Sequence, residues 1–225
     1  MLTVSLLGEP AFCWQGMRLE PGTQKASACL VFMALQCEGV SRAELSRLLW
    51  TNKKGNLRVE LHRLRRLEGA ELWLKNERLL SVQAKTDVGS FEIAIANEAF
   101  ADALAIYQGE KHKTFCLRLE PKRAPAFLDW LESERLRLQR LLNIALRGQL
   151  DKCERDALYP DALHWARLLL AQDELLESHH RTVIRLELAC GNRDAAQKQL
   201  EHCHQIMAEQ LHIAPSWATR RLLEQ

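Results

Sequence analysis

The chain has 225 residues, 47% of them hydrophobic and 27% charged, which is enough apolar material for one large domain or two small ones. Its longest apolar run, Cys29 to Leu35, is far too short to span a bilayer, and no signal-peptide pattern opens the sequence. The seven cysteines are odd in number and contain no Cys-x-x-Cys pair, which argues against a disulfide framework or a zinc ribbon. We therefore expect a cytoplasmic protein with no membrane partner.

The formal net charge of +2 hides an uneven distribution of charge. Residues 1–95 hold 13 Lys and Arg against 10 Asp and Glu, whereas residues 96–225 are close to balance. The densest cluster lies within residues 52–66, where six cations face a single acid, Glu60. These cations are Lys53, Lys54, Arg58, Arg63, Arg65 and Arg66.

The first half of the chain begins with a β pattern and then becomes helical. Three short strands are predicted at residues 2–7, 11–14 and 17–19. After Pro21-Gly22, apolar residues from position 28 onward follow the spacing i, i+3, i+4 and i+7, which predicts a helix. Ser41 precedes Glu44 by three residues, a capping box that predicts the start of a second helix.

A third helix is predicted from Asn56 to about residue 68, followed by a hairpin. The apolar stripe of this helix consists of Leu57, Leu61 and Leu64. At about 100° per residue, a different face carries Arg58, His62 and Arg65, with Arg66 at its edge. The hairpin is predicted from strands at 71–75 and 79–82, with Arg78 at its tip.

Three strands, three helices and a terminal hairpin, with cations on the third helix, are typical of a winged helix-turn-helix. In this interpretation the third helix enters the major groove of double-stranded DNA, where arginines can reach guanine edges. Lys53, Lys54 and Arg63 would contact phosphates, and Arg78 would reach the minor groove. A solvated amphipathic helix with no role in DNA binding is the alternative left open.

The second half reads as helix almost throughout. Asp161-Ala162 recurs as Asp194-Ala195 after 33 residues, and Gly191-Asn192 supplies a turn between helices. A period near 34 residues with helix–turn–helix units is typical of tetratricopeptide-like stacking; an ordinary helical bundle is the alternative. The predicted fold class is therefore an α+β winged helix-turn-helix domain at 1–95, followed by an all-α tetratricopeptide-like helical domain at 96–225.

The sequence supports no catalytic, cofactor or metal site. Motifs for nucleotide loops, nucleophile elbows and zinc proteases are absent, so we expect no enzyme activity. The histidines of His202-Cys203-His204 point in different directions on a helix and cannot share a metal. His179-His180 is interpreted in the same way, as surface or partly buried histidines. Among the tryptophans, Trp14 is expected at the surface and Trp217 in a core or domain contact.

Several segments together resemble a known family. They are Ser41-Arg42-Ala43-Glu44-Leu45, Leu48-Leu49-Trp50, residues 56–67, Asp87 followed by Phe91, Trp130-Leu131-Glu132, and residues 211–216. Over nearly its whole length the chain resembles the bacterial transcriptional activator domain family, which includes the Streptomyces antibiotic regulatory proteins. Segment 56–67 is similar to the family's recognition helix and is the most specific part of the match. His212 stands where the family usually has Gly, which affects one turn.

The resemblance implies a DNA-binding transcription regulator, typically an activator that binds repeated promoter sites and recruits RNA polymerase. It adds Asn56 to the DNA-binding residues, because this residue opens the segment that is similar to the recognition helix. A second copy of the chain, in a homodimer, is a further candidate partner, and a small effector is left open. The alternatives are a helical interaction scaffold, whose winged helix serves protein contacts, and a regulator gated by a small effector.

Overall fold

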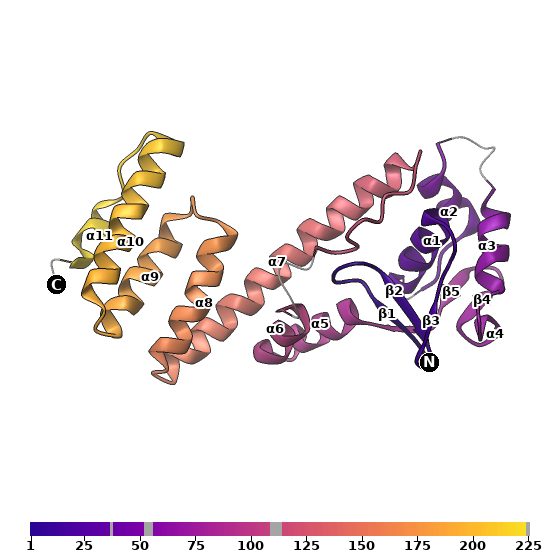
Figure 1. The fold of residues 1–225 in the computed structure, drawn as a ribbon, viewed down its shortest axis with the longest axis horizontal. Helices are drawn as coiled ribbons and strands as arrows, with labels where there is room; N and C mark the ends of the chain where they lie inside the picture. The colour runs from indigo at the N-terminus through magenta and orange to yellow at the C-terminus, as the bar shows by residue number, and fades with distance from the viewer. Residues whose placement is uncertain (37, 52–55, 109–113, 224–225) are drawn as a thin grey trace. The chain divides into compact units, whose positions relative to one another are not determined.

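The computed structural model describes residues 1–36, 38–51, 56–108 and 114–223 (Figure 1). The chain divides into two compact units, an N-terminal unit at Met1–Leu141 and a C-terminal unit at Leu142–Gln225. All described strands belong to the N-terminal unit, and the described residues of the C-terminal unit are helical or connect helices. The fold is thus a strand-containing winged helix-turn-helix region followed by a long all-helical region, as the sequence predicts.

A four-stranded sheet opens the N-terminal unit. Its order is β3-β2-β1-β6, formed by β1 (Leu2–Ser5), β2 (Ala11–Trp14), β3 (Met17–Leu19) and β6 (Ala84–Thr86). The three N-terminal strands are confirmed, but β1 ends at Ser5 rather than residue 7. It ends there because the amides of Leu6 and Leu7 donate to the Asp87 carboxylate at 2.8–3.0 Å instead of continuing the ladder.

Three helices follow the first strands, as predicted. They are α1 (Gln24–Leu35), α2 (Arg42–Leu49) and α3 (Leu57–Arg65). The Ser41 hydroxyl accepts the Glu44 amide at 3.1 Å, which confirms the predicted cap. Helix α3 ends before residue 68, because the amide of Arg66 turns back to the carbonyl of Arg63 in a tighter i−3 bond.

The predicted hairpin is present but shorter. Residues 71–73, expected as strand, belong to helix α4 (Ala70–Trp73), and the hairpin strands are β4 (Leu74–Asn76) and β5 (Leu80–Val82). The helical turn buries Trp73, whose indole NH donates to the Glu68 carbonyl at 3.1 Å. Gly69 begins this turn with φ +69, and a Cβ there would lie 2.3 Å from Nε1 of Trp14. Trp14 is therefore buried, and its expected surface position is wrong.

The N-terminal unit extends beyond the winged helix. It also contains α5 (Asp87–Ala96), α6 (Phe100–Gln108) and the first part of α7 (Pro125–Arg155). The Trp130 ring packs on Phe32 of α1 with the ring centroids 4.9 Å apart. The amide of Cys116 donates to the Leu6 carbonyl at 2.7 Å, which places residues 114–117 against the end of β1. By compactness the chain divides after Leu141. The expected division into a winged helix-turn-helix DNA-binding domain at 1–95 and a helical domain at 96–225 stays a prediction.

The C-terminal unit is built from stacked helices that repeat. They are the end of α7, α8 (Tyr159–Gln172), α9 (Glu177–Ala189), α10 (Arg193–Ile206), a π-helical turn (Met207–Leu211), α11 (Trp217–Arg220) and a 3₁₀ turn (Arg221–Leu223). The loops before α8 and α10 have the same geometry: the Leu158 amide donates to the Cys153 carbonyl, and the Asn192 amide to the Glu187 carbonyl, both at 2.8 Å. These equivalent residues are 34 positions apart, one more than the offset of 33 predicted from Asp161 and Asp194.

Two further side-chain predictions for this unit are wrong. His180 is fully buried, and hydrogen-bond partners offset the cost of burying its ring nitrogens: the Glu174 carbonyl at 2.7 Å and the Gln199 side chain at 2.8 Å. Its neighbour His179 is buried as well. Trp217, expected in a core or domain contact, is 63% exposed, and its ring stacks under the Arg221 guanidinium.

The repeat generates a prediction for a matched pair of loop residues. Ala157 and Gly191 occupy equivalent positions, with φ +56 and +79, and a Cβ costs about 1–2 kcal/mol in this left-handed region. We expect Ala157→Gly to raise the free energy of unfolding by up to about 1 kcal/mol and Gly191→Ala to lower it by a similar amount. Thermal and urea unfolding of both variants measure this. Changes of the same sign in the two variants would contradict the equivalence of the loops.

Candidate nucleic-acid interface

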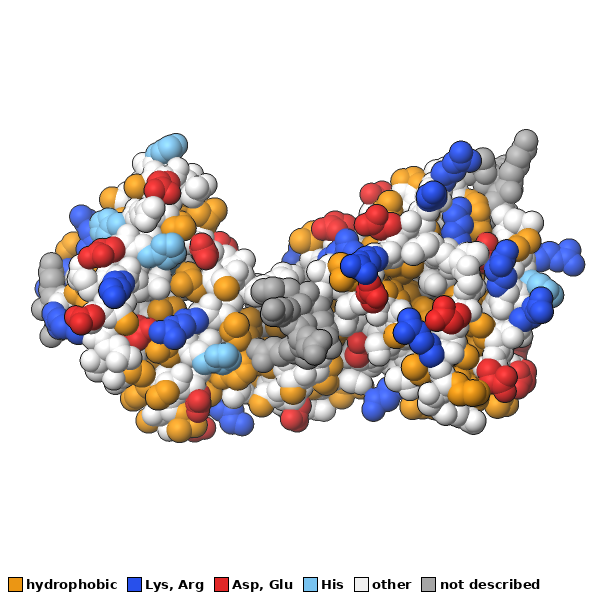
Figure 2. Space-filling model, viewed as in Figure 1, with side chains coloured by type: hydrophobic (Ala, Val, Ile, Leu, Met, Phe, Trp, Pro, Cys, Tyr) orange, Lys and Arg blue, Asp and Glu red, His pale blue; other side chains and the backbone are white. Residues whose placement is uncertain are grey.

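Helix α3 is amphipathic in the way the sequence predicts. Leu57, Leu61 and Leu64 are buried, and the helix packs against α1. The charged residues of α3 therefore point away from the core. All the described cations predicted to bind DNA are exposed in the structure: Arg58, His62, Arg63, Arg65, Arg66 and, in the hairpin, Arg78. Figure 2 shows Lys and Arg side chains gathered at the edge of the N-terminal unit where α3 lies.

The exposed side of α3 has two parts. Val59, His62, Arg63 and Arg66 follow the spacing i, i+3, i+4 and i+7, so they form one outward stripe, opposite the leucines. We call these four residues the outer stripe. Arg58 and Arg65, one heptad apart, lie at the side of α3 that faces α2. At about 100° per residue, Arg58, His62 and Arg65 span an arc of about 60°, so they are neighbours on one face, and His62 belongs both to this face and to the outer stripe.

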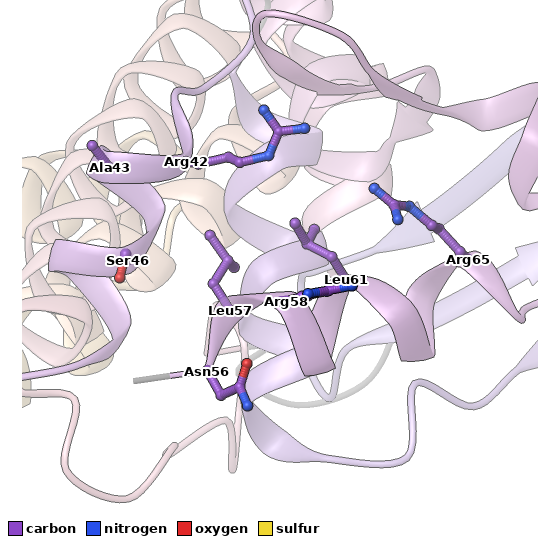
Figure 3. A pocket seen from close by; sticks show the side chains of 8 residues that line it. All are labelled: Arg42, Ala43, Ser46, Asn56, Leu57, Arg58, Leu61 and Arg65. Atoms are coloured by element: carbon purple, nitrogen blue, oxygen red, sulfur yellow. The ribbon is translucent and has the colours of Figure 1, made fainter. Parts of the chain in front are cut away.

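A hollow of about 590 Å³ lies between α2 and α3 (Figure 3). Its lining residues are Arg42, Ala43, Ser46, Asn56, Leu57, Arg58, Leu61 and Arg65. Three guanidiniums and one hydroxyl therefore border an open depression with a leucine floor. Arg42 also donates to the Glu77 carbonyl at 3.3 Å, which ties the start of α2 to the tip of the hairpin. No pattern in the sequence indicates that Arg42 and Ser46 lie beside the cations of α3.

The hairpin is fixed against the segment that precedes α2. Val40 and Leu80 exchange two backbone hydrogen bonds, of 2.7 and 2.8 Å, next to Gly39. Gly39 has φ +80, and a Cβ there would lie 3.1 Å from the Leu80 carbonyl oxygen, so a side chain would crowd this pairing. Arg78 is consequently at the tip of a hairpin that is attached through Glu77 to Arg42 of α2 and through Leu80 of β5 to Val40.

Glu60, the one acid of the basic cluster, positions α3. Its carboxylate accepts a 2.7 Å hydrogen bond from the Thr23 hydroxyl and lies 3.7 Å from Nε of Arg63. Only 13% of the Glu60 side chain is exposed, so this carboxylate lies in the contact between α1 and α3. Thr23 is also the N-cap of α1, where its hydroxyl accepts the Ala26 amide at 3.0 Å. One threonine thus links the start of α1 to the middle of α3.

The remaining predicted residues are placed as follows. Asn56 is the N-cap of α3, but its side chain makes no capping hydrogen bond and lines the hollow instead. The side-chain amide of Asn56 can therefore contact a ligand in the hollow. Lys53 and Lys54 lie outside the described residues.

Burial shifts the pKa values of several cysteine and histidine side chains outside this surface. Burial raises the pKa of the Cys29 and Cys116 thiols far above their ordinary value, so neither thiol forms the reactive thiolate at neutral pH. Burial also lowers the pKa of His180, which favours the neutral ring. Within the described ranges, His, Cys, Asp and Glu side chains form no group of three suited to a metal. None of the helices described has the length and apolar character needed to cross a membrane.

The fold and this surface define a winged helix-turn-helix followed by a tetratricopeptide-like helical region. No protein-family model matches the sequence, and no curated protein matches it. Among solved structures, the chain is similar to Mycobacterium tuberculosis EmbR in complex with a low affinity phosphopeptide, with a TM-score of 0.67 and 18% sequence identity. The match covers 99% of this chain and 64% of the EmbR chain, so this chain spans less than two thirds of the protein it resembles. At 18% sequence identity, the similarity to this structure shows the fold alone.

The link from Thr23 to Glu60 yields a stability prediction. Thr23→Ala removes a helix cap and a hydrogen bond to a carboxylate, so we expect it to lower the free energy of unfolding by about 2–4 kcal/mol. Ser41→Ala is the matched control, because it removes only the cap of α2 and should cost about 1 kcal/mol. Chemical denaturation of both variants gives the comparison. Equal losses would mean that the contact with Glu60 does not hold α3 in place.

Proposed function

We propose that this chain is a sequence-specific DNA-binding transcription regulator that reads duplex DNA with α3. The observation that carries the proposal is the amphipathic division of α3: buried leucines fix the helix on the core, and cations cover its exposed side. The major groove of B-DNA admits an α-helix, and phosphates on both sides of the groove attract exposed Lys and Arg. The hairpin with Arg78, held beside α2, supplies the wing.

Different residues are proposed to take different parts of the duplex. Arg58 and Arg65 lie on the same side of α3 with Asn56 at its start, and guanidinium forks and amides are the groups that read guanine and adenine edges. A second set is proposed to contact phosphates and to position the helix without reading sequence. This set consists of Lys53, Lys54, Arg63 and Arg66, and Arg78 at the hairpin tip is proposed to reach the minor groove. His62 belongs to the outer stripe and is proposed to face the groove.

The rest of the proposed function rests on the family resemblance. We propose that the regulator is an activator, that it binds repeated promoter sites as a homodimer, and that its helical region recruits RNA polymerase. Stacked helical repeats support the last point, because they offer extended surfaces for protein contacts. The alternatives are a helical scaffold and an effector-gated regulator. A salt-dependent affinity for duplex DNA separates the proposed function from the scaffold.

The proposal predicts salt-dependent and sequence-dependent DNA binding. With four to six phosphate contacts, the logarithm of the affinity should fall with the logarithm of salt concentration with a slope of roughly −4 to −5. Arg58→Ala or Arg65→Ala should weaken a selected duplex by about 5- to 150-fold and a random duplex by less, because an arginine fork on a guanine carries about 1–3 kcal/mol of discrimination. Fluorescence anisotropy on both duplexes at several salt concentrations measures these effects.

Two comparisons control this experiment. Lys53→Ala and Lys54→Ala should weaken both duplexes by similar factors and make the salt slope shallower. Arg155→Ala removes one exposed cation from the C-terminal unit and should leave both affinities nearly unchanged. A flat salt dependence would overturn DNA binding and favour the scaffold. Proportional losses on both duplexes in all the α3 variants would reduce α3 to an electrostatic patch.

A further inference from the structure

Val59 is an apolar residue on the exposed side of a helix whose other exposed side chains are polar or charged. Val59 is 39% exposed, whereas the three leucines of α3 are buried. At about 100° per residue it lies roughly 200° from Leu57, on the far side of the helix from the core. Val59 therefore does not fill the core of the N-terminal unit.

The neighbours of Val59 belong to the surface proposed to meet DNA. His62, Arg63 and Arg66 follow it at i+3, i+4 and i+7 in the outer stripe, and all three are exposed. Val59 also lies in the first turn of α3, where its amide donates to the Asn56 carbonyl at 3.0 Å. The N-terminal residues of a recognition helix are those that reach base edges in helix-turn-helix proteins. Valine is also a poorer helix former than most residues, so helix stability does not explain its presence here.

We propose that Val59 contacts the 5-methyl group of a thymine in the major groove and makes α3 prefer a thymine at that position. This inference rests on the proposed function and adds to it the identity of one base. The thymine methyl is the apolar group that the major-groove edges of the bases present, and an apolar side chain next to it excludes water from both. The cations beside Val59 hold the helix to the phosphates, so the two isopropyl methyls can lie close to the base edge.

The test replaces each thymine of a selected duplex, one at a time, by deoxyuridine, which lacks only the methyl group. We expect one position in each binding site at which this change weakens binding of the unchanged protein by about fourfold, the effect of burying one methyl-sized group. With Val59→Ala, the affinity for the thymine duplex should fall by a similar factor and the difference between thymine and uracil at that position should disappear. The four affinities form a double-mutant cycle that isolates the contact.

Controls separate this contact from a folding defect and from a failure of the proposed function. Val59→Ala should not lower the melting temperature, because the side chain is exposed and alanine is the better helix former. Leu72→Ala removes another exposed apolar side chain, outside α3, and should leave every thymine-to-uracil effect in place. If DNA binding is salt-dependent and sequence-specific but Val59→Ala leaves all the uracil effects unchanged, the methyl contact is overturned while the proposed function stands. Absence of sequence-specific binding overturns both.

Discussion

The burial of three leucines under α3 is the constraint on which the DNA-facing surface depends. A helix of nine residues is too short to be stable in isolation, so α3 exists because Leu57, Leu61 and Leu64 pack against the rest of the N-terminal unit. Their burial fixes the rotation of the helix about its axis, and rotation determines which side chains face outward. The arginines of α3 are exposed because the three leucines occupy the side of the helix that packs against the core. A polar residue at Leu61 would therefore change both the stability of this unit and the orientation of its cations.

Neighbouring elements turn this orientation into a composite surface. The carboxylate of Glu60 ties α3 to the N-cap of α1 through Thr23, and the pairing of Val40 with Leu80 ties the hairpin to the segment before α2. Because each link is made between elements distant in sequence, α2, α3 and the hairpin are held together in a fixed arrangement. This arrangement brings Arg42 beside the arginines of α3 in one hollow, while the residues of the outer stripe are exposed.

Local patterns in the sequence predict the helices of this surface better than the contacts between residues that are far apart in the chain. The leucine period of α3 and the Ser41 cap depend on residues three or four positions apart, so both are visible in the sequence. The helix at residues 71–73 is set instead by the burial of Trp73 and by the contact between Trp14 and Gly69. The parallel pairing of β6 with β1 and the place of Arg42 in the hollow depend equally on residues far apart in the chain. Patterns over three or four residues do not indicate contacts of this kind.

The central claim is that the exposed side of α3 enters the major groove. Photocrosslinking tests this most directly, with a photoreactive side chain placed at His62 in the outer stripe and, for comparison, at exposed Lys198 on α10. The account predicts that position 62 crosslinks to one or two defined bases of the bound duplex, through atoms exposed in the major groove, and that position 198 crosslinks to none. Crosslinks from position 62 that are absent, or that are no more frequent and no more base-specific than those from position 198, would contradict it.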